Sequence, residues 1–217
     1  MRRLFGVVLV MLGLAASSTA RADAPPPGRA AIGEELHGYY VAERNTAFLF
    51  MGIGAASAGA GAVLATRDGD FARGLGWSLV AVGGLELLGA AFYAFQVDAE
   101  IDHYTGVLAK DPDAYKREES AHIHGTTSRF LYYRIGELVL AVAGTGLAIY
   151  GFAADEDVYK GVGLGIAVSA LTFFILDGFG QSRAKRYEER VNRFDPSVAF
   201  SPGVGDRPWA LTVGGRF

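Results

Sequence analysis

The chain contains 217 residues, of which 51% are hydrophobic, 20% are charged and 30 are Gly. Its mean hydropathy is +0.23, and its charged residues are clustered between long uncharged segments, which is typical of a small polytopic membrane protein rather than a disordered chain. The absence of Cys excludes disulfides, thiolate metal sites and a Cys nucleophile. A formal net charge of −3 gives no electrostatic basis for binding nucleic acid.

The first 22 residues have the pattern of an export signal. Arg2 and Arg3 precede an apolar run that starts at Leu4, and small residues with an A-x-A-like step follow up to Ala22. The apolar run has about 13 residues, fewer than the roughly 20 that a membrane-spanning helix needs. We therefore predict a cleaved signal peptide over residues 1–22.

Four further segments are long and apolar enough to predict membrane-spanning helices. Short polar connections join them in pairs, so the members of each pair must run antiparallel. We predict an N-terminal periplasmic segment over residues 23–45 and two transmembrane hairpins over residues 46–97 and 130–180. The apolar segments are Asn45–Thr66, residues 74–97 with the single charge Glu86, Phe130–Ala154, and Gly161–Ser182.

Apolar residues continue at helical spacing among charged residues after each predicted hairpin. We therefore predict amphipathic helical extensions over residues 98–129 and 181–194. Within the first extension, Asp111 and Pro112 predict the start of a connecting helix, and the Gly-Thr-Thr-Ser sequence at residues 125–128 predicts a break or a cap before the third apolar segment. The residues at helical spacing are Val97, Ile101, Tyr104 and Leu108 in the first case, and Ala184, Tyr187, Val191 and Phe194 in the second.

The last 23 residues, 195–217, contain two short alternating runs separated by Pro and Gly, which predict a hairpin-like tail. The end at Phe217 is similar to the final strand of outer-membrane barrel proteins, except at Gly215. One such strand does not make a barrel, and four apolar helices favour the inner membrane. The predicted fold is an all-α membrane protein, a four-transmembrane-helix bundle of two tandem hairpins with amphipathic extensions and a short β-hairpin-like tail.

Two signals predict opposite orientations in the membrane. A cleaved signal peptide places the mature N-terminus in the periplasm, and four crossings return the C-terminus to the same side. The positive-inside rule predicts the reverse, because the short loops hold only Arg67, Arg73 and Lys160 while most of the other basic residues lie on the opposite side. Giving the signal peptide more weight, we predict a bacterial inner-membrane protein with periplasmic termini.

Small residues recur on single faces of the apolar segments. Such faces allow two helix backbones to approach closely in a membrane. The pattern is equally consistent with packing inside the protein's own bundle and with a homo-oligomer. The predicted packing residues are Gly54, Ala58 and Gly61 in the first hairpin, and Gly144, Gly161 and Gly165 in the second.

Three ionisable residues within the apolar segments form the candidate intramembrane site: Glu86, Arg134 and Glu137. An acidic residue at the centre of a spanning helix costs about 2.5–3.5 kcal/mol, so its presence needs a reason. Arg134 and Glu137 are one turn apart and can pair on one face of the helix. One hypothesis is a proton- or cation-responsive site; the other is a buried hydrogen bond or ion pair that fixes helix packing. Asp177 is interpreted as an interfacial residue.

Other motifs point to no specific chemistry. His122 and His124 lie on different faces of a helix, so we expect no metal site there, and we expect no cofactor. No arrangement typical of a catalytic site stands out. The predicted function is therefore a non-enzymatic structural or assembly component of a bacterial envelope complex, which contacts the lipid bilayer and either other envelope proteins or itself as a homo-oligomer, but not nucleic acid. The alternatives are a small channel or proton-coupled transport subunit and, with less support, a membrane enzyme.

Overall fold

The computed structural model describes residues 27–201 and 210–213, and four long helices make up most of this part. The prediction of an all-α helical bundle is confirmed. The predicted signal peptide lies outside the described residues, as do residues 202–209 and 214–217 of the tail. The helices are α1 (Arg29–Ala65), α2 (Asp70–Lys110), α3 (Pro112–Ala154) and α4 (Asp157–Arg193).

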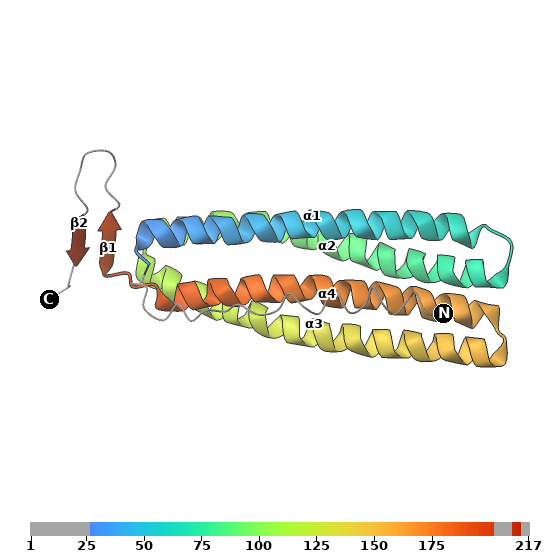
Figure 1. Ribbon diagram of the computed structural model, residues 1–217. Helices are drawn as coiled ribbons and strands as arrows, with labels where there is room; N and C mark the ends of the chain where they lie inside the picture. The colour runs from blue at the N-terminus through green and yellow to red at the C-terminus, as the bar shows by residue number, and fades with distance from the viewer. Residues whose placement is uncertain (1–26, 202–209, 214–217) are drawn as a thin grey trace.

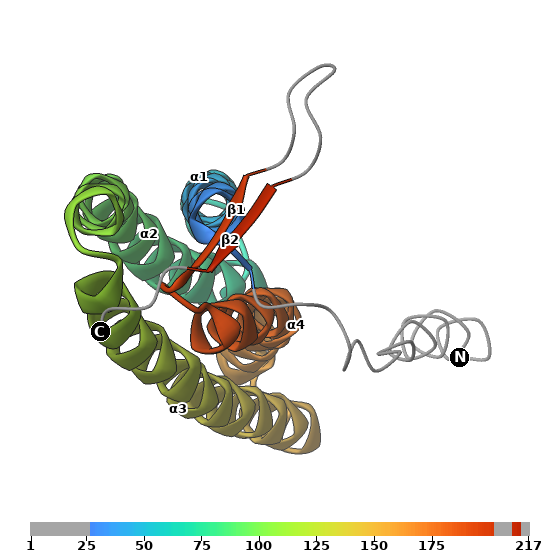
Figure 2. The same cartoon turned by 90° about the vertical axis from the view of Figure 1, so that its left-hand side faces the viewer.

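The helices pair as two hairpins that lie side by side (Figure 1). Helix α1 packs along α2, helix α3 packs along α4, and α2 and α4 supply most of the contact between the hairpins. Both hairpin turns, residues 66–69 and 155–156, lie at one end of the bundle. The start of α1, the α2–α3 connection at Asp111 and the end of α4 lie at the other end, which Figure 2 views along the helices.

Two short strands follow α4. Strand β1 (Val198–Ser201) pairs antiparallel with β2 (Ala210–Val213), with Val198 opposite Val213 and Ser201 opposite Ala210. They lie at the same end of the bundle as the start of α1 (Figures 1 and 2).

The connection between the hairpins differs in part from its prediction. The predicted cap is confirmed, because the Asp111 carboxylate accepts hydrogen bonds from the backbone N–H groups of Asp113 (3.1 Å) and Ala114 (3.0 Å). The predicted break at residues 125–128 is wrong, because α3 runs through it without interruption. The Thr127 hydroxyl donates to the Ile123 carbonyl one turn earlier (3.0 Å), and Ile123 is buried, so tertiary packing outweighs the weak helix propensity of this segment.

Large buried side chains are concentrated in one half of the bundle. This half, residues 29–44, 97–129 and 183–194, is named the head bundle. Its interior is rich in tyrosine, and the rings of Tyr39 and Tyr187 stack with centroids 4.3 Å apart. The core residues are Ile32, Leu36, Tyr39, Tyr40, Val97, Tyr104, Leu108, Tyr115, Ile123, Ala184, Tyr187, Val191 and Phe194.

The other half, residues 45–96 and 130–182, is named the apolar half, and its burial pattern is reversed. Every residue that is buried there is Gly, Ala or Ser. Large apolar side chains point outward instead, among them Phe95, Leu85 and Leu88, which are 81%, 74% and 70% exposed. Each of the four helices is long and apolar enough to cross a membrane. A surface of large apolar side chains around an interior of small residues is the arrangement expected where lipid is the solvent.

The predicted small residues lie at contacts between helices of one chain. A Cβ atom at Gly54 would lie 2.7 Å from the carbonyl oxygen of Gly83, and one at Gly83 would lie 2.7 Å from the backbone nitrogen of Ala58. A Cβ at Gly61 would lie 2.6 Å from the carbonyl oxygen of Gly76. The backbones of α1 and α2 therefore approach too closely for any side chain at these glycines.

The second hairpin uses its small residues on two sides. A Cβ at Gly144 would lie 2.6 Å from the backbone nitrogen of Ala167, which is a contact between α3 and α4. Gly161 faces the backbone of Phe71, and Gly165 faces the side chain of Ser78. Helix α4 therefore packs against α3 and, close to the turn end, against α2.

Candidate functional site

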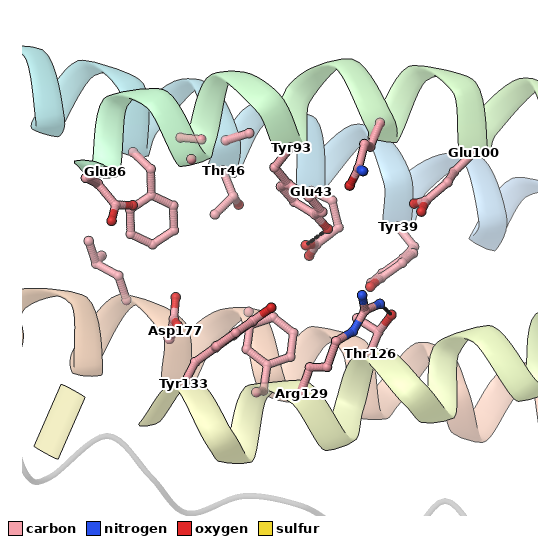
Figure 3. A pocket seen from close by; sticks show the side chains of 18 of the residues that line it. Tyr39, Glu43, Thr46, Glu86, Tyr93, Glu100, Thr126, Arg129, Tyr133 and Asp177 are labelled. Carbon is pink, nitrogen blue, oxygen red and sulfur yellow. Dashed lines mark hydrogen bonds between the residues drawn. The ribbon is translucent and has the colours of Figure 1, made fainter. Parts of the chain in front are cut away.

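A cavity of about 280 Å³ lies between the two hairpins, where the head bundle meets the apolar half (Figure 3). The closest glycine contacts between α2 and α4 lie nearer the turns, so the hairpins are held together on one side of the cavity by small residues and on the other by the tyrosine core. All four helices line the cavity. Its carboxyl-bearing residues are Glu43, Glu86, Glu100 and Asp177, and its aromatic residues are Tyr39, Phe50, Tyr93, Phe130 and Tyr133.

Glu43 on α1 is a buried carboxylate that is held by three helices. It is 2% exposed, and it accepts hydrogen bonds from the Tyr93 hydroxyl (2.9 Å) and from Nε of Arg183 (2.8 Å). The Arg183 guanidinium also donates to the Thr46 hydroxyl (2.8 Å). These bonds neutralise Glu43 and join α1, α2 and α4 at the wall of the cavity.

The end of the cavity in the head bundle contains both signs of charge. Glu100 lies 3.6 Å from Nε2 of His122. Burial raises the pKa of Glu100, while the positive charge of Arg129 lowers it. Burial lowers the pKa of His122, and Arg129 lowers it further, so the imidazole is held in its neutral form over more of the pH range.

The end of the cavity in the apolar half is acidic. Glu86 on α2 and Asp177 on α4 extend toward each other from opposite walls (Figure 3). A second cavity of about 420 Å³ shares four lining residues with the first and also contains Glu137. The two cavities are therefore adjacent. The shared residues are Phe50, Glu86, Tyr133 and Asp177.

Glu137 and Asp177 form a carboxyl pair across α3 and α4. Both side chains line the second cavity, Glu137 from α3 and Asp177 from α4, so two carboxyl groups border the same space. The second oxygen of Glu137, Oε2, is buried and has no hydrogen-bond partner among the described residues. A buried polar atom without a partner is costly, and such atoms are concentrated at functional positions.

The structure brings together only part of the predicted site. Glu86 and Glu137 line one cavity, but Arg134 contacts other partners than Glu137. Its guanidinium donates to Oε1 of Gln181 (3.0 Å) and lies 4.3 Å from the ring centroid of Phe174. Asp177, which we interpreted as an interfacial residue, lines both cavities and shares the second one with Glu137.

The head bundle contains a second buried carboxyl group, which the sequence analysis did not single out. Glu119 is fully buried and accepts a hydrogen bond from the Tyr40 hydroxyl (3.0 Å), and the hydroxyls of Tyr115 and Tyr187 lie 2.9 Å apart beside it. Burial raises the pKa of Glu119 to about 8, although hydrogen bonds from Tyr187 and Tyr40 act in the opposite direction. Glu119 lies in a run of charged residues. Only its position four residues after Tyr115 and four residues before Ile123 places it on the same helix face as these apolar residues.

Three histidines of the head bundle, His103, His122 and His124, lie close to carboxylates of other helices. His103 lies 3.4 Å from Glu118, and His124 lies 2.8 Å from Glu188. In the described part of the chain, no group of three or more His, Asp or Glu side chains is arranged to hold a metal ion.

The chain matches no protein-family model, no curated protein and no solved structure. Its chemistry must therefore be inferred from the cavity residues. Carboxyl groups on the wall of a cavity in an apolar helix bundle can attract cations and exchange protons.

Proposed function

We propose that this chain is an integral membrane protein that takes up protons or small cations into the cavity between its hairpins, and that this uptake serves transport or sensing. The carboxyl pair of Glu137 and Asp177, with Glu86 opposite, carries the proposal. In the apolar half, whose buried residues are Gly, Ala and Ser, three half-buried carboxyl groups around one space are costly to retain unless they bind something.

The depth of Glu86 supports this proposal. Charged residues resume after Val97, so Glu86 lies roughly 16 Å along the helix axis from the end of its apolar segment. That distance is about half of the ~30 Å hydrocarbon core of a bilayer. The cavity extends from there to Glu100 and His122 in the head bundle. A cation that enters from the head-bundle side would therefore meet carboxyl groups at successive depths.

The location that we propose is the bacterial inner membrane, with both termini in the periplasm. The signal-like sequence at residues 1–22 and the four apolar helices support it. In this orientation the head bundle faces the periplasm, and the short turns face the cytoplasm.

The proposal can be tested in liposomes. The purified chain would be reconstituted with a trapped pH-sensitive dye and a potassium diffusion potential. We expect proton or cation flux that Glu86→Gln and Asp177→Asn each reduce by about tenfold or more, because each removes a protonatable group. The matched control is Asp102→Asn, an exposed carboxylate on α2 outside the cavity. Wild-type liposomes without flux, or equal loss in the control, would contradict transport.

A second candidate function is favoured by the head bundle. Its fully buried core extends the four helices well beyond their apolar segments and presents charged side chains outward. A rigid extramembrane platform of this kind suits a non-enzymatic component of an envelope assembly that binds other envelope proteins or a second copy of itself. Purification in mild detergent tests this function: a discrete complex of defined stoichiometry supports it, and a monomer alone contradicts it.

A further inference from the structure

We infer that the cavity of about 280 Å³ between the hairpins binds a small organic cation, an amine or a quaternary ammonium, with the charged nitrogen between Glu86 and Asp177. This inference rests on the proposed function and specifies its ligand class. The volume lies just below the range of about 300–1,000 Å³ typical of ligand pockets, so the ligand must be small.

The walls of the cavity have the composition of an ammonium site. Five aromatic side chains line it, and the faces of such rings attract cations within about 6 Å of the ring centroid. At the acidic end, Phe50 and Tyr133 lie beside Glu86 and Asp177 and line both cavities. An alkylated nitrogen can interact with aromatic rings and with a carboxylate at once, and this end of the cavity has both.

The charge balance favours a cation over an anion or a neutral molecule. Of the four carboxyl-bearing residues, Glu43 is neutralised by Arg183. Arg129 lies at the opposite end from Glu86 and donates to the Thr126 hydroxyl (2.8 Å). No basic side chain among the described residues lines the cavity at its acidic end, so a cation there faces Glu86 and Asp177 without a competing positive charge on the wall.

The arrangement of the oxygens favours an organic cation over a metal ion. Metal ions such as Ca²⁺ need six or more oxygen ligands that converge at 2.3–2.6 Å. Glu86 and Asp177 extend instead from opposite walls, with aromatic side chains around them (Figure 3). Two separated carboxyls with aromatic side chains around them match a bulky, diffuse charge.

The test is equilibrium binding of choline to the detergent-purified full chain, by calorimetry, against its neutral isostere 3,3-dimethyl-1-butanol. We expect saturable choline binding and at least about tenfold weaker binding of the isostere. Glu86→Gln and Tyr133→Leu should each weaken choline binding about fivefold or more, whereas Asp102→Asn should leave it within about twofold. If Glu86→Gln does not fold, as judged by helicity and gel filtration, Asp177→Asn replaces it, and the isostere comparison needs no variant.

No saturable binding up to about 20 mM choline, or equal binding of the isostere, overturns the inference. Flux without choline binding would overturn the organic-cation site and leave the proposed cation uptake in place. Choline binding without flux would support the site and contradict transport. A soluble amine and a lipid headgroup share this chemistry. Repeating the titration in vesicles with and without phosphatidylethanolamine separates them, because a headgroup that occupies the site would compete with choline.

Discussion

Glu43 and Arg183 are 140 residues apart in the sequence and form a 2.8 Å ion pair that joins α1 to α4. With Tyr93 donating to the same carboxylate, the pair connects both hairpins at the wall of the cavity. Because this ion pair joins the two hairpins at the wall, the shape of the cavity depends on keeping both charges.

Removing either charge should therefore destabilise the bundle. Arg183→Met would leave Glu43 buried with an uncompensated charge, and we expect the free energy of unfolding to fall by about 3 kcal/mol. The measurement is denaturant unfolding in mild detergent. The control is Arg44→Met, because Arg44 pairs with Asp98 at the surface, where such a pair contributes about 0–1 kcal/mol. Equal losses for the two variants would show that the Glu43 pair has no special role.

Glu119 should make the stability of the head bundle depend on pH. Its pKa in the folded chain is about 8, against an ordinary value of 4.5. The folded state therefore binds a proton on Glu119 more tightly than the unfolded state does. The stabilisation that this proton provides is fully present below about pH 4.5 and is lost as the pH rises through 8. Between these values stability should fall by up to about 1.4 kcal/mol per pH unit.

The Glu119→Gln variant tests this dependence by thermal unfolding between pH 5 and pH 9. The amide oxygen can still accept from Tyr40 but does not titrate, so we expect the pH profile to flatten. The neighbouring Glu118→Gln is the matched control, because Glu118 is half exposed and pairs with His103. A wild-type profile without a decline toward alkaline pH would contradict the buried-acid interpretation.

The sequence predicts features that depend on the residues of a single helix, but it does not predict which side chains of two different helices come into contact. The four helices, the Asp111 cap and the small-residue faces follow from local spacing, and the structure has the helices and the cap. The partners of Arg134 and Asp177 do not follow from it. Arg134 reaches Gln181, 47 residues away, because the rotation of α3 against α4 decides which side chains meet. The sequence does not single out Glu43, because this residue precedes the apolar segment. Helix α1 begins earlier, at Arg29, and so includes it.

Two neighbouring glycines on α3 should respond differently to the same substitution. A Cβ at Gly144 would lie 2.6 Å from the backbone of Ala167, whereas one at Gly146 meets nothing within 4 Å. Gly144→Ala must therefore separate α3 from α4, and we expect a loss of at least about 1 kcal/mol from the lost packing. Gly146→Ala should be neutral or stabilise by up to about 1 kcal/mol through helix propensity. Unfolding of both variants in detergent gives the comparison, and equal effects would contradict the close approach.

The native chain has no Cys, so single cysteines can report which side of the membrane each end of the bundle faces. Both turns lie at one end and the head bundle at the other (Figure 1). Asp68→Cys and Glu156→Cys, one in each turn, should therefore behave alike, and Asp102→Cys in the head bundle should behave oppositely. All three positions are exposed.

In intact cells, a membrane-impermeant maleimide should label only Asp102→Cys if the termini are periplasmic. Labelling of both turn cysteines but not the head-bundle cysteine would show that the basic residues, and not the signal-like sequence, determine the orientation. Labelling of one turn without the other would contradict the two-hairpin membrane arrangement itself.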